Sequence, residues 1–598
     1  MDRGEGSSLP PVKKRTILVS VVLIVILGFA VYGNSLDGEF LWDDTSLVKD
    51  NLYIRNCSRI GKLFSGHIST KSVNFRFYRP FQMISYVMDH SLWKADARGY
   101  HLTNLLLHIA VALAVYWLVN ILFKDILLSF LTGIFFLVHP VHTEAVSYIS
   151  GRSDPLAALF MLLCFIFYVK GINTGRTKFF FLAIPAYAGA LLSREAGLIL
   201  IILLLLYHFA FKKEIKLKGF LPLLGVTFVY IALRLTVLKG LVAAPAASGR
   251  FFQRLPGFFA AITEYTRLMA LPFHLHMEYG APLFELNAPE VIAGVLILSF
   301  ALACALKKRT GNRLVFFSIF WFFVALLPVS NLYPVNAYMA EHWLYVPSIG
   351  LFLLLAKGLS YLYRRGKSRV ISAGLITGIL IFYSSLTFRQ NTYWREPAAF
   401  YERTLRYVPD SPRLYANLGK IYRSTGRKEE AIALFEKAVE LNPDFPEAYN
   451  NLGNAYSDAG RKEKAIALLK KAVTINPDYA EAYYNLGNAY NDTGRKKEAL
   501  ASFRKAIEAN PDFSEAYNNL GKAYADTGRK EEAITFLEKA VTIDPDYAMA
   551  HNNLAVIYYD MGEYALAVKH SDMALKLGSK VHPGFLRHLE PHRNRKIR

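Results

Sequence analysis

The first two thirds of the chain alternates long apolar runs with short charged stretches, whereas the last third is amphipathic and polar. The apolar runs approach the length that crosses a bilayer, and tilt or flanking polar residues complete the shorter ones. They lie at roughly 16–32, 102–123, 126–138, 155–169, 178–192, 196–211, 219–238, 289–306, 314–330, 343–362 and 370–388. This pattern predicts an all-α chain with a polytopic membrane helical bundle of about eleven spans and a soluble helical domain after it.

The charged loops between these runs predict the orientation of the bundle. Lys13, Lys14 and Arg15 precede the first run and no small-residue cleavage site follows it, so we expect a retained span with a cytoplasmic N-terminus. Basic clusters then fall on alternate loops, at 124–125, 170–178, 212–218, 307–313 and 364–369. An odd number of spans places everything after residue 388 on the periplasmic, extracytoplasmic or lumenal side. Segment 251–273, broken by two prolines, is expected to be a re-entrant or surface-lying helix.

The polar third is repetitive with a constant step. Asn-Leu pairs, a proline and a glycine each recur every 34 residues, and this period is typical of the tetratricopeptide helix-turn-helix repeat. The glycines are Gly426, Gly460, Gly494, Gly528 and Gly562. The predicted domains are a cytoplasmic N-terminal tail (1–15), a transmembrane domain (16–388), a connector with half a repeat (389–411), five repeats forming an α-solenoid (412–580) and a basic C-terminal tail (581–598).

Composition agrees with a membrane protein joined to a soluble domain. Of the 598 residues 53% are hydrophobic and only 19% are charged. The net charge of +22 has a ready explanation in the cytoplasmic Lys and Arg of membrane proteins, so we expect no nucleic-acid partner. The three cysteines offer neither a disulfide framework nor metal-ligand spacing. No cofactor is indicated, and the sequence does not support a divalent metal, although one is compatible with the chemistry considered below.

Ionisable residues gather at the outer ends of the apolar runs, where uncompensated charge is expensive and points to function. They are Asp37, Glu39, Asp43 and Asp44 in the first loop, then His139, His142, Glu144, Arg152, Asp154, Arg194, Glu195, Glu341 and His342.

Simpler structural explanations exist for several of these residues. Asp154 precedes Pro155 and could cap a helix. Arg194 and Glu195 could pair with each other. His139 could do no more than end a helix, and the two aspartates at 43 and 44 could be a solvated loop pair.

Several strings of residues resemble the transmembrane and tetratricopeptide repeat-containing protein O-mannosyltransferases, within the GT-C group of multi-span glycosyltransferases. The strings are Glu39-Phe40-Leu41-Trp42-Asp43-Asp44, Tyr78-Arg79-Pro80-Phe81, His101-Leu102-Thr103-Asn104, His139-Pro140-Val141-His142-Thr143-Glu144-Ala145-Val146, Gly151-Arg152-Ser153-Asp154, Ser193-Arg194-Glu195 and Glu341-His342-Trp343-Leu344-Tyr345-Val346-Pro347-Ser348. The resemblance extends over nearly the whole chain. The short, regular repeat array differs from the animal members and suggests a prokaryotic relative.

The resemblance implies transfer of a sugar, mannose in this family, from a polyprenyl phosphate donor to a Ser or Thr hydroxyl of a protein. A hydroxyl needs a general base, and Asp43 is the first candidate, with Asp44 second and Glu144, Glu195 and Glu341 as further acidic candidates. The phosphate leaving group needs positive charge rather than an acid. Arg79, His139, His142, Arg152 and Arg194 are the candidates to hold it. One-step displacement inverts the anomeric carbon.

The repeats are expected to present the acceptor. Asn417, Asn451, Asn485, Asn519 and Asn553 keep the 34-residue step and form a ladder, similar to that of the O-GlcNAc transferase repeats. An amide both donates and accepts, so the ladder could hold an extended peptide backbone. The alternative is that these asparagines only tie neighbouring repeats together.

Two other functions are compatible with the sequence. The chain could be a GT-C enzyme that modifies a lipid or a polysaccharide, with the repeats binding a partner. It could also be a non-enzymatic membrane scaffold whose repeats recruit envelope proteins.

Overall fold

The computed structural model describes residues 11–51, 53–55, 57–64, 78–236, 251–280, 282–308, 311–330, 332, 337–365 and 369–593. These residues form helices and loops and include no strand, which confirms the predicted all-α class. They divide into two compact units that meet in sequence between Val408 and Pro409. We refer to them as the membrane unit and the repeat unit.

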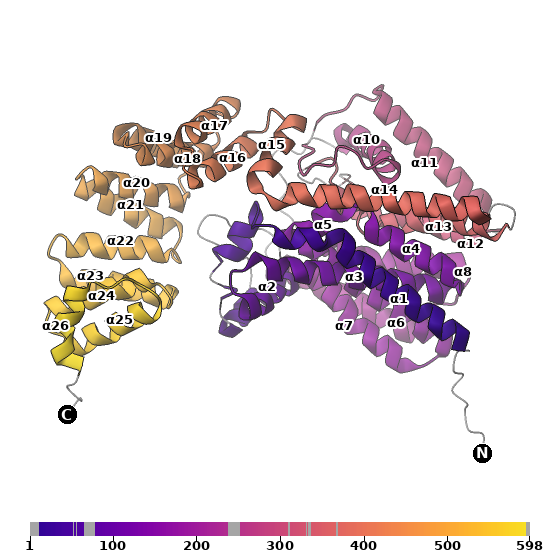
Figure 1. The fold of residues 1–598 in the computed structure, drawn as a ribbon, viewed down its shortest axis with the longest axis horizontal. Helices are drawn as coiled ribbons and strands as arrows, with labels where there is room; N and C mark the ends of the chain where they lie inside the picture. The colour runs from indigo at the N-terminus through magenta and orange to yellow at the C-terminus, as the bar shows by residue number, and fades with distance from the viewer. Residues whose placement is uncertain are drawn as a thin grey trace, which may run out of the picture. The chain divides into compact units, whose positions relative to one another are not determined.

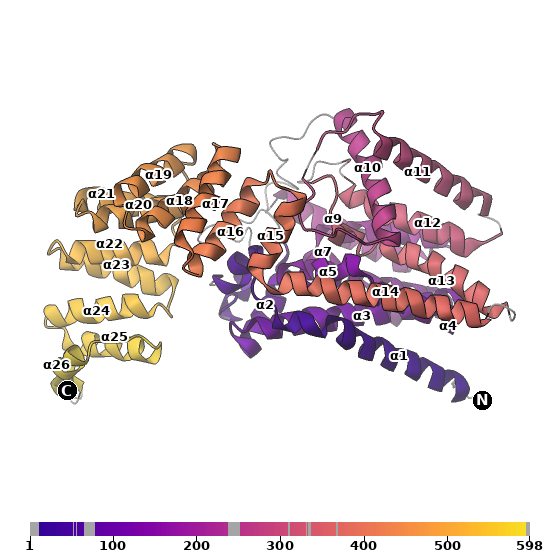
Figure 2. The ribbon, with the colours of Figure 1, turned by 45° about the horizontal axis from the view of Figure 1, so that its top comes forward.

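Every apolar run predicted from the sequence carries a helix in the membrane unit. These helices are α1 (Pro11–Tyr32), α3 (Ala97–Phe123), α4 (Ile126–Val138), α6 (Ser153–Thr174), α7 (Thr177–Ser193), α8 (Leu200–Phe211), α9 (Leu217–Thr236), α11 (Pro289–Lys308), α12 (Arg313–Leu326), α13 (Ser348–Arg364) and α14 (Arg369–Arg395). Figures 1 and 2 show many of them running side by side along the length of this unit.

The number of spans is smaller when each helix is judged by length and apolar composition. In the described part of the chain, six helices are long and apolar enough to cross a membrane. A seventh is added if α4 and the segment 140–147, bent from it by 55°, are counted as one span. Shorter apolar helices, such as 177–193, need tilt or flanking residues to cross. The count of eleven therefore stays a prediction.

The segment predicted as a re-entrant or surface-lying helix forms α10 (Phe251–Ala270). It packs closely on α11, because Gly294 faces the backbone of Phe259. A Cβ added at Gly294 would lie 1.9 Å from the Phe259 carbonyl oxygen, so only glycine permits this approach.

Short helices and turns outside the predicted spans carry some of the polar residues of interest, including Glu144, Glu195 and Glu341. They are α2 (Pro80–Trp93), α5 (Thr143–Ser147) and α15 (Pro397–Tyr407), with single 3-10 turns such as Glu195–Ile199 and Glu341–Leu344. In both views α2 and α15 lie at the end of the membrane unit opposite the start of α1 (Figures 1 and 2).

The repeat unit consists of five antiparallel helix pairs, as the 34-residue period predicts. The pairs are α16 (Pro412–Ser424) with α17 (Lys428–Leu441), α18 (Pro446–Asp458) with α19 (Lys462–Ile475), α20 (Ala480–Asp492) with α21 (Lys496–Ala509), α22 (Ser514–Ala525) with α23 (Lys530–Ile543), and α24 (Ala548–Asp560) with α25 (Tyr564–Lys576). The repeating glycine sits at each turn in the left-handed region, with φ of 83° at Gly426 and 75° at Gly460. The predicted basic tail contains a further helix, α26 (Pro583–Arg593), whose Leu589 is buried.

Candidate functional site

The two adjacent aspartates of the first loop have different environments. The buried carboxylate of Asp44 accepts hydrogen bonds from the backbone N–H of Leu41 (3.0 Å) and of Ser150 (2.7 Å), and from the Ser150 hydroxyl. Burial raises the pKa of Asp44 to about 7, although these hydrogen bonds oppose the rise. Asp43 is exposed, and its backbone N–H donates to the hydroxyl of Tyr148 at 3.1 Å. Asp44 therefore fastens the loop, and Asp43 is the carboxylate of the two that solvent and a substrate can reach.

A residue with unusual backbone geometry precedes the two aspartates. Trp42 has φ of 51°, in the left-handed region that a tryptophan rarely adopts. Its ring lies 5.8 Å from that of Tyr401 on α15. Trp42 lies between the buried Leu41 and the exposed Asp43.

Two arginines from distant parts of the sequence meet at one serine. The guanidinium of Arg79 binds both carboxylate oxygens of Glu195, at 2.8 and 3.3 Å, and Arg194 forms an ion pair with Asp154. Both arginines also approach the hydroxyl of Ser153, at 3.4 and 3.5 Å. We call Arg79 and Arg194 the arginine pair. Their side chains keep 17% and 11% exposure, so a ligand can reach them.

These contacts replace two of the simpler explanations considered for the sequence. Arg194 has extended backbone geometry between α7 and the next turn, so Arg194 and Glu195 bind different partners instead of each other. Asp154 lies inside the first turn of α6 rather than at its cap, which is Arg152, and its carboxylate pairs with Arg194.

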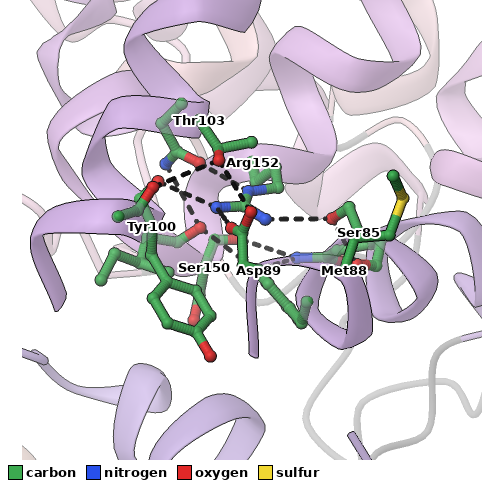
Figure 3. Close-up of polar contacts among 12 residues, drawn as sticks. Ser85, Met88, Asp89, Tyr100, Thr103, Ser150 and Arg152 are labelled. Carbon is green, nitrogen blue, oxygen red and sulfur yellow. Dashed lines mark hydrogen bonds and ion pairs between the residues drawn. The ribbon is translucent and has the colours of Figure 1, made fainter. Parts of the chain in front are cut away.

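Arg152, which we expected to hold phosphate, lies instead in the interior with no exposed surface (Figure 3). Its guanidinium pairs with Asp89 at 2.6 Å and donates to the side chain of Asn104 (2.6 Å), the carbonyl of Tyr100 (2.9 Å) and the hydroxyl of Ser85 (3.2 Å). These contacts engage all three of its guanidinium nitrogens, so Arg152 joins α2, α3 and the turn Ile149–Arg152.

The expected phosphate ligands His139 and His142 are also fully buried. Nδ1 of His139 accepts the N–H of Val141 and its Nε2 contacts the carbonyl of Met269. Nδ1 of His142 contacts the carbonyl of Phe136 (2.8 Å) and its Nε2 the hydroxyl of Ser348 (3.0 Å). Both rings pack among aromatic side chains at the bend that follows α4. With both ring nitrogens occupied, each histidine stabilises this bend, and neither is available to a phosphate in this arrangement.

The acidic candidates Glu144 and Glu341 come together around the 341–344 turn. Glu144 accepts the ring Nδ1–H of His342 (2.7 Å) and its backbone N–H (2.9 Å). Glu341 is buried and accepts the hydroxyl of Tyr279 (2.7 Å) and the N–H of His276 (2.5 Å). Burial raises the pKa of Glu341 well above its usual value, and the nearby charge of Glu144 raises it further.

His342 connects this acidic group to the arginine pair. A small cavity of about 40 Å³ is lined by residues that include Asp154, Arg194, His342 and Trp343. This volume is about that of one water molecule. From the sequence, His342 counts among the outer ionisable residues beside Glu341 but receives no role in the reaction. Its pairing with Glu144, 198 residues away, leaves no local signal.

The asparagine ladder is present in the repeat unit, with most of its amides turned to neighbouring repeats. Asn485 donates to Asn450 (2.9 Å) and Asn553 to Asn518 (2.8 Å). Asn519 donates to Asn488 (2.8 Å) and also to a tyrosine hydroxyl. The amide nitrogen of the buried Asn451 has no hydrogen-bond partner. Three of the asparagines therefore connect neighbouring repeats, as the alternative explanation states. Asn417 is half-buried, and the amide nitrogen of Asn451 makes no hydrogen bond.

The described residues contain no cluster of three or more His, Cys, Asp or Glu side chains that could hold a metal ion.

Comparison with known proteins supports the family resemblance. The chain is 28% identical over 453 residues to Protein O-mannosyl-transferase F38B6.6 of Caenorhabditis elegans, with 71% of this chain and 63% of that protein covered. It is a relative of the protein O-mannosyl-transferases. A human relative, Protein O-mannosyl-transferase TMTC2, is 25% identical over 514 residues, covering 69% of this chain and 61% of that protein. The chain thus spans less than two thirds of these relatives.

Sequence profiles confirm the repeats. Profiles described as TPR repeat match residues 419–460 and 453–494, and two described as Tetratricopeptide repeat match 484–548 and 536–569. Among solved structures, the crystal structure of MamA is 32% identical, covers 27% of this chain and 94% of that chain, and has a TM-score of 0.25.

Proposed function

We propose that this chain is an integral-membrane, inverting glycosyltransferase. It moves a sugar, mannose by analogy with its relatives, from a polyprenyl phosphate to Ser or Thr hydroxyls of protein acceptors. The observation that carries the proposal is the first loop, where Asp44 and Tyr148 hold the backbone so that the carboxylate of Asp43 stays exposed. The names of the relatives support the reaction class.

The residues have separate roles in the proposed reaction. Asp43 takes the proton of the acceptor hydroxyl as its oxygen bonds to the anomeric carbon. The bond from that carbon to the phosphate oxygen breaks on the opposite face, and the phosphate leaves as an anion. Arg79 and Arg194 hold this phosphate. Glu195 orients the guanidinium of Arg79, and Asp154 orients that of Arg194. His342, beside Arg194, contributes a further polar contact.

The repeat unit presents the protein acceptor in this proposal, with the half-buried Asn417 as the ladder position whose amide an acceptor can reach, whereas the amide nitrogen of Asn451 is buried. The reaction takes place on the periplasmic, extracytoplasmic or lumenal face, with the N-terminus in the cytoplasm. The membrane unit keeps the prenyl chain in lipid and holds the donor next to the acceptor.

A membrane assay with polyprenyl phosphate mannose and a Ser/Thr-rich peptide tests the proposal. Asp43→Asn keeps size but cannot accept the proton, so peptide mannosylation falls at least about 100-fold. Asp50→Asn, an exposed aspartate of the same loop, is the matched control and stays near the wild-type rate.

Unchanged turnover in Asp43→Asn would move the base elsewhere, with Glu144 next. Transfer to a lipid or polysaccharide but not to peptide would favour the other enzyme class. No transfer at all, combined with loss of phenotype on removal of the repeats, would favour the scaffold.

A further inference from the structure

A cavity larger than the one beside Arg194 lies at the end of α14. It has a volume of about 490 Å³, within the range of small-molecule sites. The end of α14, the helix α15 and the loop 272–275 form its walls. None of the aspartates, arginines or glutamates assigned to the reaction lines it.

Its lining carries an excess of positive charge. Arg389, Arg403 and Arg406 face one carboxylate, Glu402. Arg403 donates to the Gln390 amide oxygen at 3.1 Å, with its guanidinium 3.6 Å from the centre of the Tyr393 ring. Arg389 donates to the Tyr393 hydroxyl at 3.0 Å. Among the described residues no carboxylate forms an ion pair with any of the three arginines.

The surroundings of the cavity place it at the boundary between lipid and water. Helix α14 is one of the six candidate spans, and its last turns supply the cavity wall. Phe273, which lines the cavity, is 40% exposed, and Phe388, one residue before Arg389, is 47% exposed. Tyr393 and Tyr407 add the amphipathic rings that are enriched at membrane surfaces.

We propose that this cavity binds the phosphate of an anionic phospholipid headgroup. Guanidinium groups bind phosphate oxygens in pairs, and arginines near a membrane surface attract anionic lipids. The exposed apolar side chains at Phe273 and Phe388 give the acyl chains a surface that a free phosphate or an acidic peptide would not use. The site is independent of the proposed sugar transfer and stays testable if that proposal fails.

The test uses the full chain, purified in detergent and titrated with phosphatidylglycerol or phosphatidylcholine, with bound lipid counted by native mass spectrometry. Phosphatidylglycerol binds at least about tenfold more tightly than phosphatidylcholine. Arg406→Gln removes an exposed charge that makes no observed contact, so the fold is retained and the preference weakens. Arg403→Gln weakens the preference for phosphatidylglycerol more than Arg406→Gln does. Arg395→Gln, an exposed arginine at the end of α14 that does not line the cavity, leaves it unchanged.

Two further titrations distinguish the sources of the anion. Inorganic phosphate and a soluble acidic peptide are added to the lipid-loaded chain, and neither displaces phosphatidylglycerol at comparable concentration. Equal binding of the two lipids, equal preference in wild type and Arg406→Gln, or ready displacement by either soluble anion would overturn the proposal.

Discussion

Glu144 holds His342 with both carboxylate oxygens, one on the ring Nδ1 at 2.7 Å and the other on the backbone N–H at 2.9 Å. This double contact fixes the orientation of an imidazole that lines the same cavity as Arg194. In the proposed reaction Glu144 is a positioning residue, because both of its carboxylate oxygens already contact His342.

Replacing Glu144 by Gln keeps the shape of the side chain but removes its charge and one acceptor. We expect sugar transfer to fall by about 10- to 100-fold, because a misplaced contact at the phosphate weakens the reactive geometry. The donor KM should rise more than the acceptor KM in steady-state kinetics. The double variant with His342→Gln should be little worse than either single variant, whereas additive losses would show that the two residues act separately.

The buried carboxylate of Asp44 predicts a pH dependence of stability. Its pKa rises from 3.8 to about 7 on folding, with burial as the main cause. Between these values the folded chain binds a proton that the unfolded chain has lost, so stability falls as pH rises through this window. We expect the melting temperature of the solubilised chain to fall by about 5 °C between pH 4.5 and 7 from this group.

Asp44→Asn should resemble the protonated wild type at low pH, since an amide and a neutral acid have similar shape and acceptor capacity, and should lose this part of the pH dependence. Asp50→Asn keeps the wild-type profile. A profile that is the same in Asp44→Asn and wild type would assign the pH dependence to other groups.

The arginines that the sequence predicts to bind the donor phosphate should differ in the effects of their replacement. Arg152→Leu leaves the buried carboxylate of Asp89 without its partner and should destabilise the fold by about 3 to 5 kcal/mol. Arg79→Gln changes a partly exposed residue and should reduce donor use while the protein still folds. Melting temperature and donor KM, measured on both variants, test this distinction. The reverse pattern would place Arg152 at the donor.

The ladder should show two kinds of asparagine. Asn519→Ala removes hydrogen bonds to the preceding repeat and should destabilise it by about 1 kcal/mol for each bond lost. Hydrogen exchange of α20 and α22 in the full chain measures this effect. Asn417→Ala should leave exchange unchanged and reduce acceptor use. Faster exchange in Asn417→Ala would mean that its role is structural too.

The proposed orientation can be tested with introduced cysteines in a chain whose native cysteines are replaced by Ala. An impermeant thiol reagent should label Lys497→Cys of the repeat unit in intact cells. It should label Lys178→Cys of a basic loop only after lysis. Both positions are exposed. The opposite pattern would invert the orientation and remove the argument for an outer active site.

The repeats could be predicted closely because their information is local and periodic. A glycine at a fixed step determines each turn, and the apolar positions of each helix pair lie within one period. The apolar helices were likewise readable as continuous runs. The number of membrane crossings could not be read from these runs, because several helices are shorter than the thickness of a bilayer.

The site was only partly predictable because its contacts are long-range. Arg194 and Glu195 are neighbours in sequence, yet their partners lie 40 and 116 positions away. His139 and His142 stand beside apolar runs, a position equally compatible with a binding site and with a buried bend. The exposure difference between Asp43 and Asp44 depends on Ser150, which no local pattern links to the loop.

Helix α15 packs with the membrane unit, where Phe400 contacts Trp394 at 4.7 Å between ring centres and Tyr401 approaches Trp42. The half repeat predicted from the sequence is therefore a part of the membrane unit, and every complete helix pair lies after Val408. A polypeptide starting at Ser411, whose hydroxyl caps α16, would retain all five pairs. Acceptor peptides could then be screened in ordinary buffer, without detergent or lipid.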